Sequence, residues 1–258
     1  MISIKNAAQL ERMRQAGALL YEVMQKLREV VRPGETTAAI DAYAEELIRK
    51  EGALPSFLNY RGYPASICAS VDDQVVHGIP TDKQPLQAGS ILSIDCGLVL
   101  DGWQADSAFT VGVGEISPPL ALLIEVTERC FFEGARQAIS GNRVGDIGHA
   151  VQTLAERHGY GVIRDLTGHG IGRNMHEDPS VPNFGEPGRG ARLRPGMTLA
   201  LEPMISLGSW QVQEMQDGWT ITTLDGSPCA HYEHTIALRA DGPPEILTLP
   251  GFVWEDGP

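Results

Sequence analysis

The sequence predicts an α/β fold built from two similar halves, and three observations support this interpretation. The order helix, helix, strands occurs twice along the 258 residues, in halves of about 1–112 and 113–258. A shift of 107 positions aligns the second helix of each half, matching Gly34 to Gly141. No linker-like or low-complexity composition separates the halves. We therefore expect one catalytic domain over 1–258, with a site between the halves.

Two helices are predicted in the first half. Apolar residues recur at helical spacing over residues 6–31, and Arg32-Pro33-Gly34 ends this run. A second helix starts at 36–37, where a threonine can cap it, and stops at Gly52. Its buried face is expected to contain Ile40, Tyr43, Leu47 and Ile48.

Two more helices open the second half. Ser117-Pro118 is a helix start, with the serine as cap and the proline at the first helical position. We expect this long helix to end near Ser140-Gly141. The next helix spans roughly 144–158 and closes at Gly159.

Two β-rich runs surround Asp101-Gly102, a strong hairpin signal. Counting back from a two-residue turn places Asp95 opposite Ala108, with Asp106 one diagonal step away on the same face. Carboxylates this close need a metal, a proton or a cationic side chain between them. Alternatively, Asp106 is a solvated residue on an exposed strand and Asp95 caps a strand end.

The composition limits the possible partners. The 20 basic and 33 acidic residues give a net charge of −13, which argues against a nucleic-acid-binding surface. The four cysteines show no C-x-x-C spacing, so neither a disulfide framework nor a zinc knuckle is indicated. No apolar run approaches the ~20 residues of a membrane span, and the N-terminus lacks a signal core. We expect a cytoplasmic protein.

The second half supplies further polar residues. His169 lies in a glycine-rich loop, Glu202 follows an apolar strand, and Glu233 interrupts a β-rich run. A charged residue in an apolar strand is costly unless it is paired or binds metal. Together with Asp95 and Asp106 they form an oxygen-rich set that suits a carboxylate-bridged pair of Mn, Fe, Co or Zn ions. Taken singly, each of these residues could be structural.

These residues and their flanks closely resemble type I methionine aminopeptidases of the bacterial kind. The motifs that carry the resemblance are Asp95, Asp106, Gly168-His169-Gly170-Ile171-Gly172, His176-Glu177, Pro195-Gly196-Met197-Thr198, Glu202-Pro203-Met204, Asp217-Gly218-Trp219-Thr220 and Tyr232-Glu233-His234-Thr235. The resemblance covers nearly the whole chain. It implies the pita-bread fold, with two pseudo-symmetric halves around a central antiparallel sheet. No zinc-binding extension or inserted helical subdomain is visible, which favours type I over type II.

The resemblance also implies roles for the metal ligands. Asp95 would bind one ion, Asp106 and Glu233 would bridge two divalent ions, and His169 and Glu202 would complete the second site. Glu202 would also act as general base towards a metal-activated water and then as proton donor to the leaving amine.

Further residues would contact the substrate. His176 would stabilise the oxyanion and His77 would contact the scissile amide. The methionine pocket would be lined by Tyr60, Tyr63, Cys68, Met175 and Trp219, with ordinary core packing as the alternative. Three positions depart from the family pattern. Met175 replaces phenylalanine, which predicts a more pliable pocket, while Asp72 replaces asparagine and His231 replaces glutamine.

The implied function is removal of the N-terminal methionine from nascent proteins and peptides whose second residue is small. The family further implies a monomer that works near the ribosome, although the acidic chain shows no basic docking patch. One alternative is an Xaa-Pro aminopeptidase or proline dipeptidase, which shares the five ligands but usually carries an extra N-terminal domain. Another is a non-catalytic binding module with the same fold, which would retain no specific metal.

Overall fold

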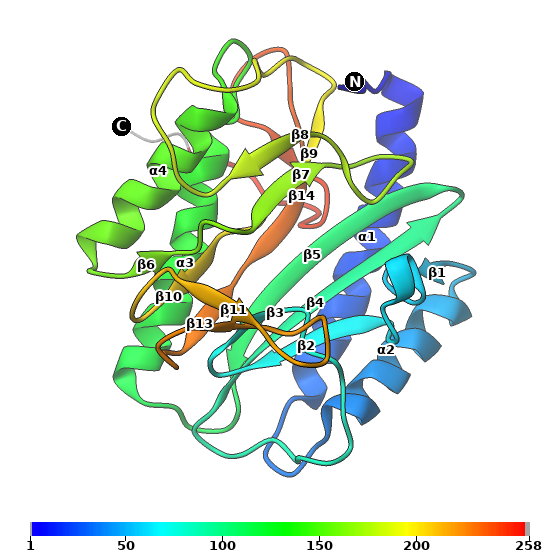
Figure 1. Cartoon of the computed structure of the whole chain (residues 1–258). Helices are drawn as coiled ribbons and strands as arrows, with labels where there is room; N and C mark the ends of the chain where they lie inside the picture. The colour runs from blue at the N-terminus through cyan, green and yellow to red at the C-terminus, as the bar shows by residue number, and fades with distance from the viewer. Residues whose placement is uncertain (1, 256–258) are drawn as a thin grey trace.

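The computed structural model describes residues 2–255 and repeats the order helix, helix, strands in both halves (Figure 1). The helices of these residues are α1 (Ala7–Val30), α2 (Thr37–Lys50), α3 (Pro118–Arg136) and α4 (Val144–Arg157), with a short 3₁₀ turn η1 (Tyr60–Gly62). The strands of the first half are β1 (Leu54–Pro55), β2 (Ile67–Val71), β3 (Gln74–Val76), β4 (Ile91–Leu100) and β5 (Trp103–Gly112). The strands of the second half are β6 (Gly161–Val162), β7 (Thr167–Gly170), β8 (Glu177–Pro182), β9 (Thr198–Leu201), β10 (Met204–Ser206), β11 (Val212–Glu214), β12 (Ile221–Thr223), β13 (Cys229–His231), β14 (Glu233–Ala237) and β15 (Glu245–Ile246).

The starts of α1 and α2 follow from their capping residues. Asn6 accepts a hydrogen bond from the backbone N–H of Gln9, and the Gln9 side chain accepts one from the N–H of Asn6. Thr36 accepts a hydrogen bond from the N–H of Ala39 in the same way. Both arrangements satisfy backbone donors that a helix leaves free at its first turn. The predicted boundaries of these two helices are confirmed.

Three details of the helices were predicted wrongly. The Ser117 side chain makes no capping hydrogen bond, although the residue does occupy the cap position of α3. The same helix ends at Arg136, several residues before the predicted stop. The residues after it form a separate turn instead, because the carbonyl of Gln137 accepts a hydrogen bond from the Asn142 side chain. Tyr43 on α2 is half-buried rather than buried.

A central antiparallel sheet connects the two halves. Its strand order is β1-β4-β5-β14-β9-β7-β8, with β2 also paired to β4 and β15 to β14. All of its described pairings are antiparallel. Two small sheets, β13-β10-β6 and β11-β12-β3, lie beside it. The strand β14 therefore joins the hairpin of the first half to strands of the second half.

The hairpin of β4 and β5 has the predicted register. Asp95 pairs with Ala108, and Gly97 pairs with Asp106. The connecting turn places Asp101 and Gly102 at φ angles of +50° and +76°. Both values are left-handed, as a two-residue hairpin turn of type I′ requires, and glycine accepts such an angle without a steric penalty.

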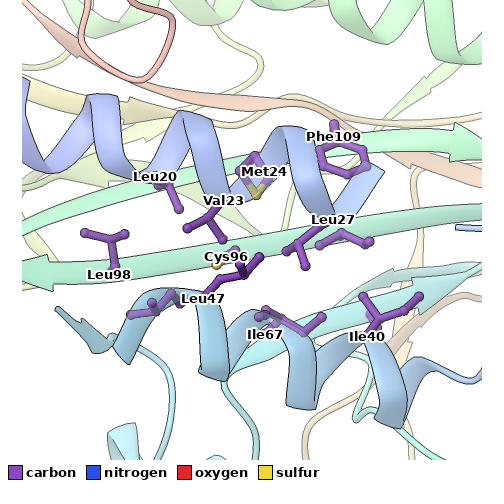
Figure 2. Close-up of a cluster of buried hydrophobic side chains, with 14 of the residues drawn as sticks. Leu20, Val23, Met24, Leu27, Ile40, Leu47, Ile67, Cys96, Leu98 and Phe109 are labelled. Atoms are coloured by element: carbon purple, nitrogen blue, oxygen red, sulfur yellow. The ribbon is translucent and has the colours of Figure 1, made fainter. Parts of the chain in front are cut away.

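The helices and the hydrophobic core cover one face of this sheet. Cys96 and Leu98 of β4 and Phe109 of β5 pack with α1 and α2 in the core of the first half (Figure 2). Leu201 of β9 packs with Phe131 of α3 in the core of the second half. Because side chains alternate along a strand, the residues between these core positions must point to the opposite face. None of the described helices is long and apolar enough to cross a membrane.

Candidate metal centre and active site

The five predicted metal ligands project from the face of the sheet that the helices leave open. Asp95 on β4 and Glu233 on β14 both pair with Ala108 on β5, so these three residues form one row across three strands. Asp106 lies two residues before Ala108 and therefore points to the same face. The hairpin and β14 thus bring three carboxylates together.

The remaining two ligands reach this face through β9. Thr235 lies two residues after Glu233 and pairs with Ala200, which in turn pairs with His169 on β7. Glu202 follows two residues after Ala200 and shares its face. His169 was predicted in a glycine-rich loop, but it lies within a strand, and this correction explains its alignment with the carboxylates.

The orientation of His169 fits a metal-binding role. Its Nδ1 atom lies 2.9 Å from the carbonyl oxygen of Gly170, which can only accept a hydrogen bond, so Nδ1 carries the proton. Its Nε2 atom lies 3.7 Å from Asp106 Oδ2 and 3.7 Å from Glu202 Oε1. One ligand atom each from Asp106, His169 and Glu233 lies within 4.8 Å of the others. Nε2 thus presents its lone pair to this group, as a metal-bound histidine does.

Several buried carboxylate oxygens have no hydrogen-bond partner among the described residues. These are Oδ1 of Asp95, Oδ1 of Asp106 and Oε1 of Glu233. Asp106 and Glu233 are only 3% and 2% exposed, which excludes a solvated position for Asp106. An unpaired buried carboxylate is costly unless it is protonated or binds a cation. The donor set of four carboxylates and one imidazole therefore fits divalent metal ions.

The electrostatics of the group agree with this interpretation. Burial raises the pKa of Asp95 to about 7. Burial, and then repulsion from Asp95, raises the pKa of Asp106 and of Glu202 well above its usual value. The pKa of Glu233 is raised by burial and then by Asp106. Burial also lowers the pKa of His169, which favours the neutral ring that metal binding needs.

A cavity of about 170 Å³ opens beside these ligands. All twelve residues that the sequence analysis singled out for metal, catalysis or substrate line it, namely Asp95, Asp106, His169, Glu202, Glu233, His77, His176, Tyr60, Tyr63, Cys68, Met175 and Trp219. Phe57 and Arg61 also line the cavity and were missed. The only nearby sequence signal was Gly62, which marks a turn there.

One wall of the cavity is held rigidly by hydrogen bonds. The Tyr63 hydroxyl donates to the carbonyl of Ile67 or Gly78, at 3.1 and 3.0 Å, and the Tyr63 ring packs edge-on against Trp219 at 5.1 Å. The Asp217 carboxylate accepts hydrogen bonds from the backbone N–H groups of Trp219 and Thr220. The Asp-Gly-Trp-Thr motif therefore forms a turn that presents Trp219 to the cavity.

Two histidines outside the metal-ligand set, His176 and His77, also line the cavity. His176 packs against His169, with ring centroids 4.3 Å apart, and its Nδ1 lies 2.8 Å from the Tyr60 hydroxyl. Burial, then the charges of His169, Arg61 and His77, lowers the pKa of His176 to about 4. Burial likewise lowers the pKa of His77. Both rings are therefore neutral near pH 7 and can donate hydrogen bonds.

The two polar departures from the family pattern have defined surroundings. Asp72 accepts hydrogen bonds from the Ser90 hydroxyl and the Ile91 N–H, both at 2.9 Å. His231 is buried, and its Nε2 lies 3.7 Å from Oε2 of Glu233. His231 therefore lies directly behind a candidate metal ligand, whereas Asp72 fixes the start of β4.

Sequence comparison relates the chain to known enzymes. Residues 11–240 match metallopeptidase family M24. The chain is 51% identical to a methionine aminopeptidase of Clostridium acetobutylicum over 249 residues, which is 96% of this chain and 99% of the relative. It is 47% identical to methionine aminopeptidase 1 of Mycobacterium tuberculosis, over 95% and 94% of the two chains. The resemblance inferred from the motifs is confirmed.

Structural comparison gives the same family and the fold. The crystal structure of methionine aminopeptidase from Rickettsia prowazekii superposes with a TM-score of 0.94 at 42% identity, over 96% of this chain and all of the other. Prolidase from Pyrococcus furiosus superposes with a TM-score of 0.77 at 19% identity and shares the fold, with this chain covering 66% of its length. The predicted pita-bread fold is therefore confirmed, and the chain belongs to metallopeptidase family M24.

Proposed function

We propose that this protein is a methionine aminopeptidase that hydrolyses the first peptide bond of proteins and peptides. The observation that carries the proposal is the convergence of Asp106, His169 and Glu233 within 4.8 Å beside a cavity whose wall combines aromatic and sulfur-containing side chains. The relatives named above support this activity, because each alignment covers at least 94% of both chains. On this proposal, residues 1–258 act as a single catalytic domain.

The metal-binding residues divide into two sites. Asp95 would hold one divalent ion, His169 and Glu202 would hold a second, and Asp106 and Glu233 would contribute to both. The unpaired oxygens of Asp95, Asp106 and Glu233 support this assignment. When bound, such ions polarise the substrate carbonyl and lower the pKa of a water molecule from 15.7 towards about 7. The oxygen-rich set accepts Mn, Fe, Co or Zn.

The roles of the other polar residues follow from their protonation. Glu202 would take a proton from the attacking water and deliver it to the leaving amine, because it is a carboxylate beside the other candidate metal ligands. Neutral His176 donates a hydrogen bond to the developing oxyanion. Neutral His77, which packs edge-on against Trp219 at 6.3 Å, orients the scissile amide.

The cavity suits the side chain of the substrate's N-terminal methionine. Tyr63, Cys68 and Met175 are buried, and Phe57 and Trp219 are half-buried, so the thioether meets apolar and aromatic surface. Sulfur contacts with ring edges are favourable, and a flexible Met175 can adjust to the substrate. We propose that the peptide continues past His176 and that a small second residue avoids a clash there.

The biological setting is part of the same proposal. We infer a cytoplasmic monomer that acts on nascent chains and approaches the ribosome transiently, without a nucleic-acid site of its own. The charge of −13 favours a weak and transient contact. Co-sedimentation with ribosomes at moderate salt tests this contact, and protein that stays in the supernatant contradicts it.

The activity is tested with three peptides and reconstituted protein. Metal-free protein is loaded with Mn, Co, Fe or Zn and assayed on Met-Ala-Ser, Leu-Ala-Ser and Ala-Pro-Ala, with Glu202→Ala as control. We expect release of methionine from the first peptide alone, and its loss in the variant. Cleavage of Ala-Pro-Ala alone would instead indicate an Xaa-Pro enzyme. Absence of turnover and of specific metal binding would indicate a binding module.

A further inference from the structure

Arg61 lies at the mouth of the substrate cavity. Of the fourteen residues that line the cavity, only Arg61 and His176 are exposed, whereas the others are half-buried or buried. A peptide that leaves the metal centre along the most exposed part of the lining passes this pair. The exposed end of the lining is therefore formed by one imidazole and one guanidinium.

The Arg61 charge has no acidic partner within the described part of the chain. Among residues 2–255, no carboxylate oxygen lies within 4.0 Å of its nitrogens, and the guanidinium carbon lies 5.4 Å from the centroid of the Tyr60 ring. Some other arginines do have an acidic partner, as Arg12 has Asp101 and Arg49 has Glu45. In a chain with a net charge of −13, an unpaired arginine facing a binding cavity is available to a ligand.

The backbone holds Arg61 in this position. Arg61 adopts φ +51° and ψ +20°, and Asn59 adopts φ +66°, so two residues other than glycine are left-handed within one turn. The turn is closed by hydrogen bonds from the Asn59 N–H to the Tyr63 carbonyl and from the Tyr63 N–H to the Tyr60 carbonyl. Left-handed conformations of such residues persist only where the surroundings enforce them, and they are frequent at functional sites. The turn thus presents Arg61 outward beside a substrate-binding tyrosine.

The distance from the cleaved bond along the substrate identifies the substrate residue that Arg61 can contact. This step rests on the proposed function, which places the first peptide bond at the metal centre beside His176. An extended peptide advances about 3.3 Å per residue, so its third residue lies ~7 Å beyond the bond that is cleaved. Tyr60 bridges the gap, because its hydroxyl contacts His176 at 2.8 Å and its ring lies beneath Arg61.

The other side of His176 has a different charge pattern. An open groove there contains Arg173 together with Glu177 and Asp178. Glu177 forms a 2.7 Å ion pair with Lys5, and Arg173 packs over the ring of Trp103 at 4.4 Å. The lining of this groove contains two carboxylates and one guanidinium, so its net charge does not favour an acidic peptide. The positive side of the mouth is the Arg61 side.

We propose that Arg61 determines substrate specificity by favouring peptides with aspartate or glutamate at the third position. A guanidinium pairs with a carboxylate through two parallel hydrogen bonds, and a lysine at that position is repelled. Because the pair is exposed to water, the preference is moderate, about two- to fivefold in kcat/KM for glutamate over glutamine.

The test compares three peptides that differ only at the third residue. Met-Ala-Glu-Ser, Met-Ala-Gln-Ser and Met-Ala-Lys-Ser, all as C-terminal amides, are cleaved by manganese-loaded protein at low and at high salt. We expect kcat/KM to fall in this order for the wild type. The ratio between the glutamate and glutamine peptides should approach one in Arg61→Gln, and Arg61→Glu should favour lysine. Added salt should reduce the wild-type ratio.

Two control variants test whether the preference for glutamate depends on Arg61. Arg49→Gln changes an exposed arginine on α2 that already pairs with Glu45, and it should keep the wild-type ratio of kcat/KM between the glutamate and glutamine peptides. If the ratio collapses in Arg173→Gln instead of Arg61→Gln, the assignment to Arg61 is wrong. Equal rates on all three peptides in the wild type overturn the preference while leaving the proposed function intact. Failure to release methionine from any of them refutes the proposed function itself.

Discussion

The hydroxyl of Tyr60 lies 2.8 Å from Nδ1 of His176, and the two rings stack with centroids 5.4 Å apart. Since the pKa of His176 is lowered to about 4, its ring is neutral near pH 7 and carries one proton. A hydrogen bond donated by Tyr60 to Nδ1 leaves that proton on Nε2. Nε2 is then the donor that the proposed oxyanion contact requires.

Replacing Tyr60 by phenylalanine tests this relationship. Tyr60→Phe keeps the stacked ring but removes the hydroxyl, so the tautomer of His176 is no longer fixed. We expect kcat to fall about three- to tenfold, with KM nearly unchanged, because the lost hydrogen bond matters most in the transition state. Steady-state kinetics on Met-Ala-Ser separates the two constants. A rise in KM at constant kcat would show that Tyr60 only binds substrate.

His231 is expected to tune metal affinity through Glu233. Burial, and then the charge of His77, lowers the pKa of His231 to about 3, so the ring is neutral behind the Glu233 carboxylate. Polar neighbours of a ligand raise metal affinity, and their removal commonly costs about tenfold. His231→Leu should weaken Mn binding by that factor, whereas His231→Gln, which retains a donor, should stay close to the wild type. Calorimetric titration measures both, and equal affinities would exclude this role.

Metal-free protein should lose stability as the pH rises from about 4 to about 7. Burial raises the pKa of Asp95 from 3.8 to about 7, so in this window the folded chain binds a proton that the unfolded chain has released. Stability then falls with increasing pH. Asp95→Asn removes this titration, and the variant should be more stable than the wild type at pH 8 in a chelator.

The difference in the free energy of unfolding between the wild type and Asp95→Asn must depend on pH. At pH 4 the wild-type carboxyl is protonated and resembles the amide, so we expect the difference in the free energy of unfolding to vanish there. Urea unfolding at several pH values measures it. A constant difference from pH 4 to pH 8 would show that packing, rather than titration, separates the two proteins. Saturating Mn should reverse the order at pH 8, because only the wild type retains the full ligand set.

The hairpin could be predicted residue by residue because its information is local. Asp101-Gly102 fixes the turn, and the alternation of side chains then fixes the pairing of Asp95 with Ala108. By contrast, Glu233 pairs with Ala108, which lies 125 positions earlier in the chain. No periodicity specifies such a pairing, so the position of Glu233 beside Asp106 was expected only through the resemblance to a known family, although its charge in a β-rich run had already marked it as a candidate ligand.

The misplaced features have a similar explanation. His169 was assigned to a loop because its glycine neighbours are typical of loops, yet their small size lets β7 pack closely between β8 and β9. A Cβ on Gly168 would lie 2.4 Å from the Ala200 carbonyl oxygen. Arg61 was missed because its exposure to the cavity depends on a left-handed backbone that only a structure reveals. Local propensity fixes the elements, whereas long-range packing decides which side chains meet.

Met175 gives the last prediction, because it replaces the phenylalanine of the family pattern in the methionine pocket. It is buried, and a Cβ placed on Gly97 would lie 3.0 Å from its terminal methyl carbon, so the space behind its flexible side chain is already filled. Met175→Phe should therefore stiffen the pocket and raise the kcat/KM ratio of Met-Ala-Ser to Leu-Ala-Ser, by about threefold to tenfold.

A second substitution tests whether the shape of the methionine pocket can change without an effect on metal binding. Gly97→Ala should push the Met175 side chain into the cavity and raise KM for Met-Ala-Ser, because the added methyl group has no other space. Both variants should keep the thermal stabilisation that Mn gives the wild type, since neither residue is a proposed ligand. A Met175→Phe protein with an unchanged ratio would place the discrimination between methionine and leucine elsewhere, with Tyr63 and Trp219 as the next residues to vary.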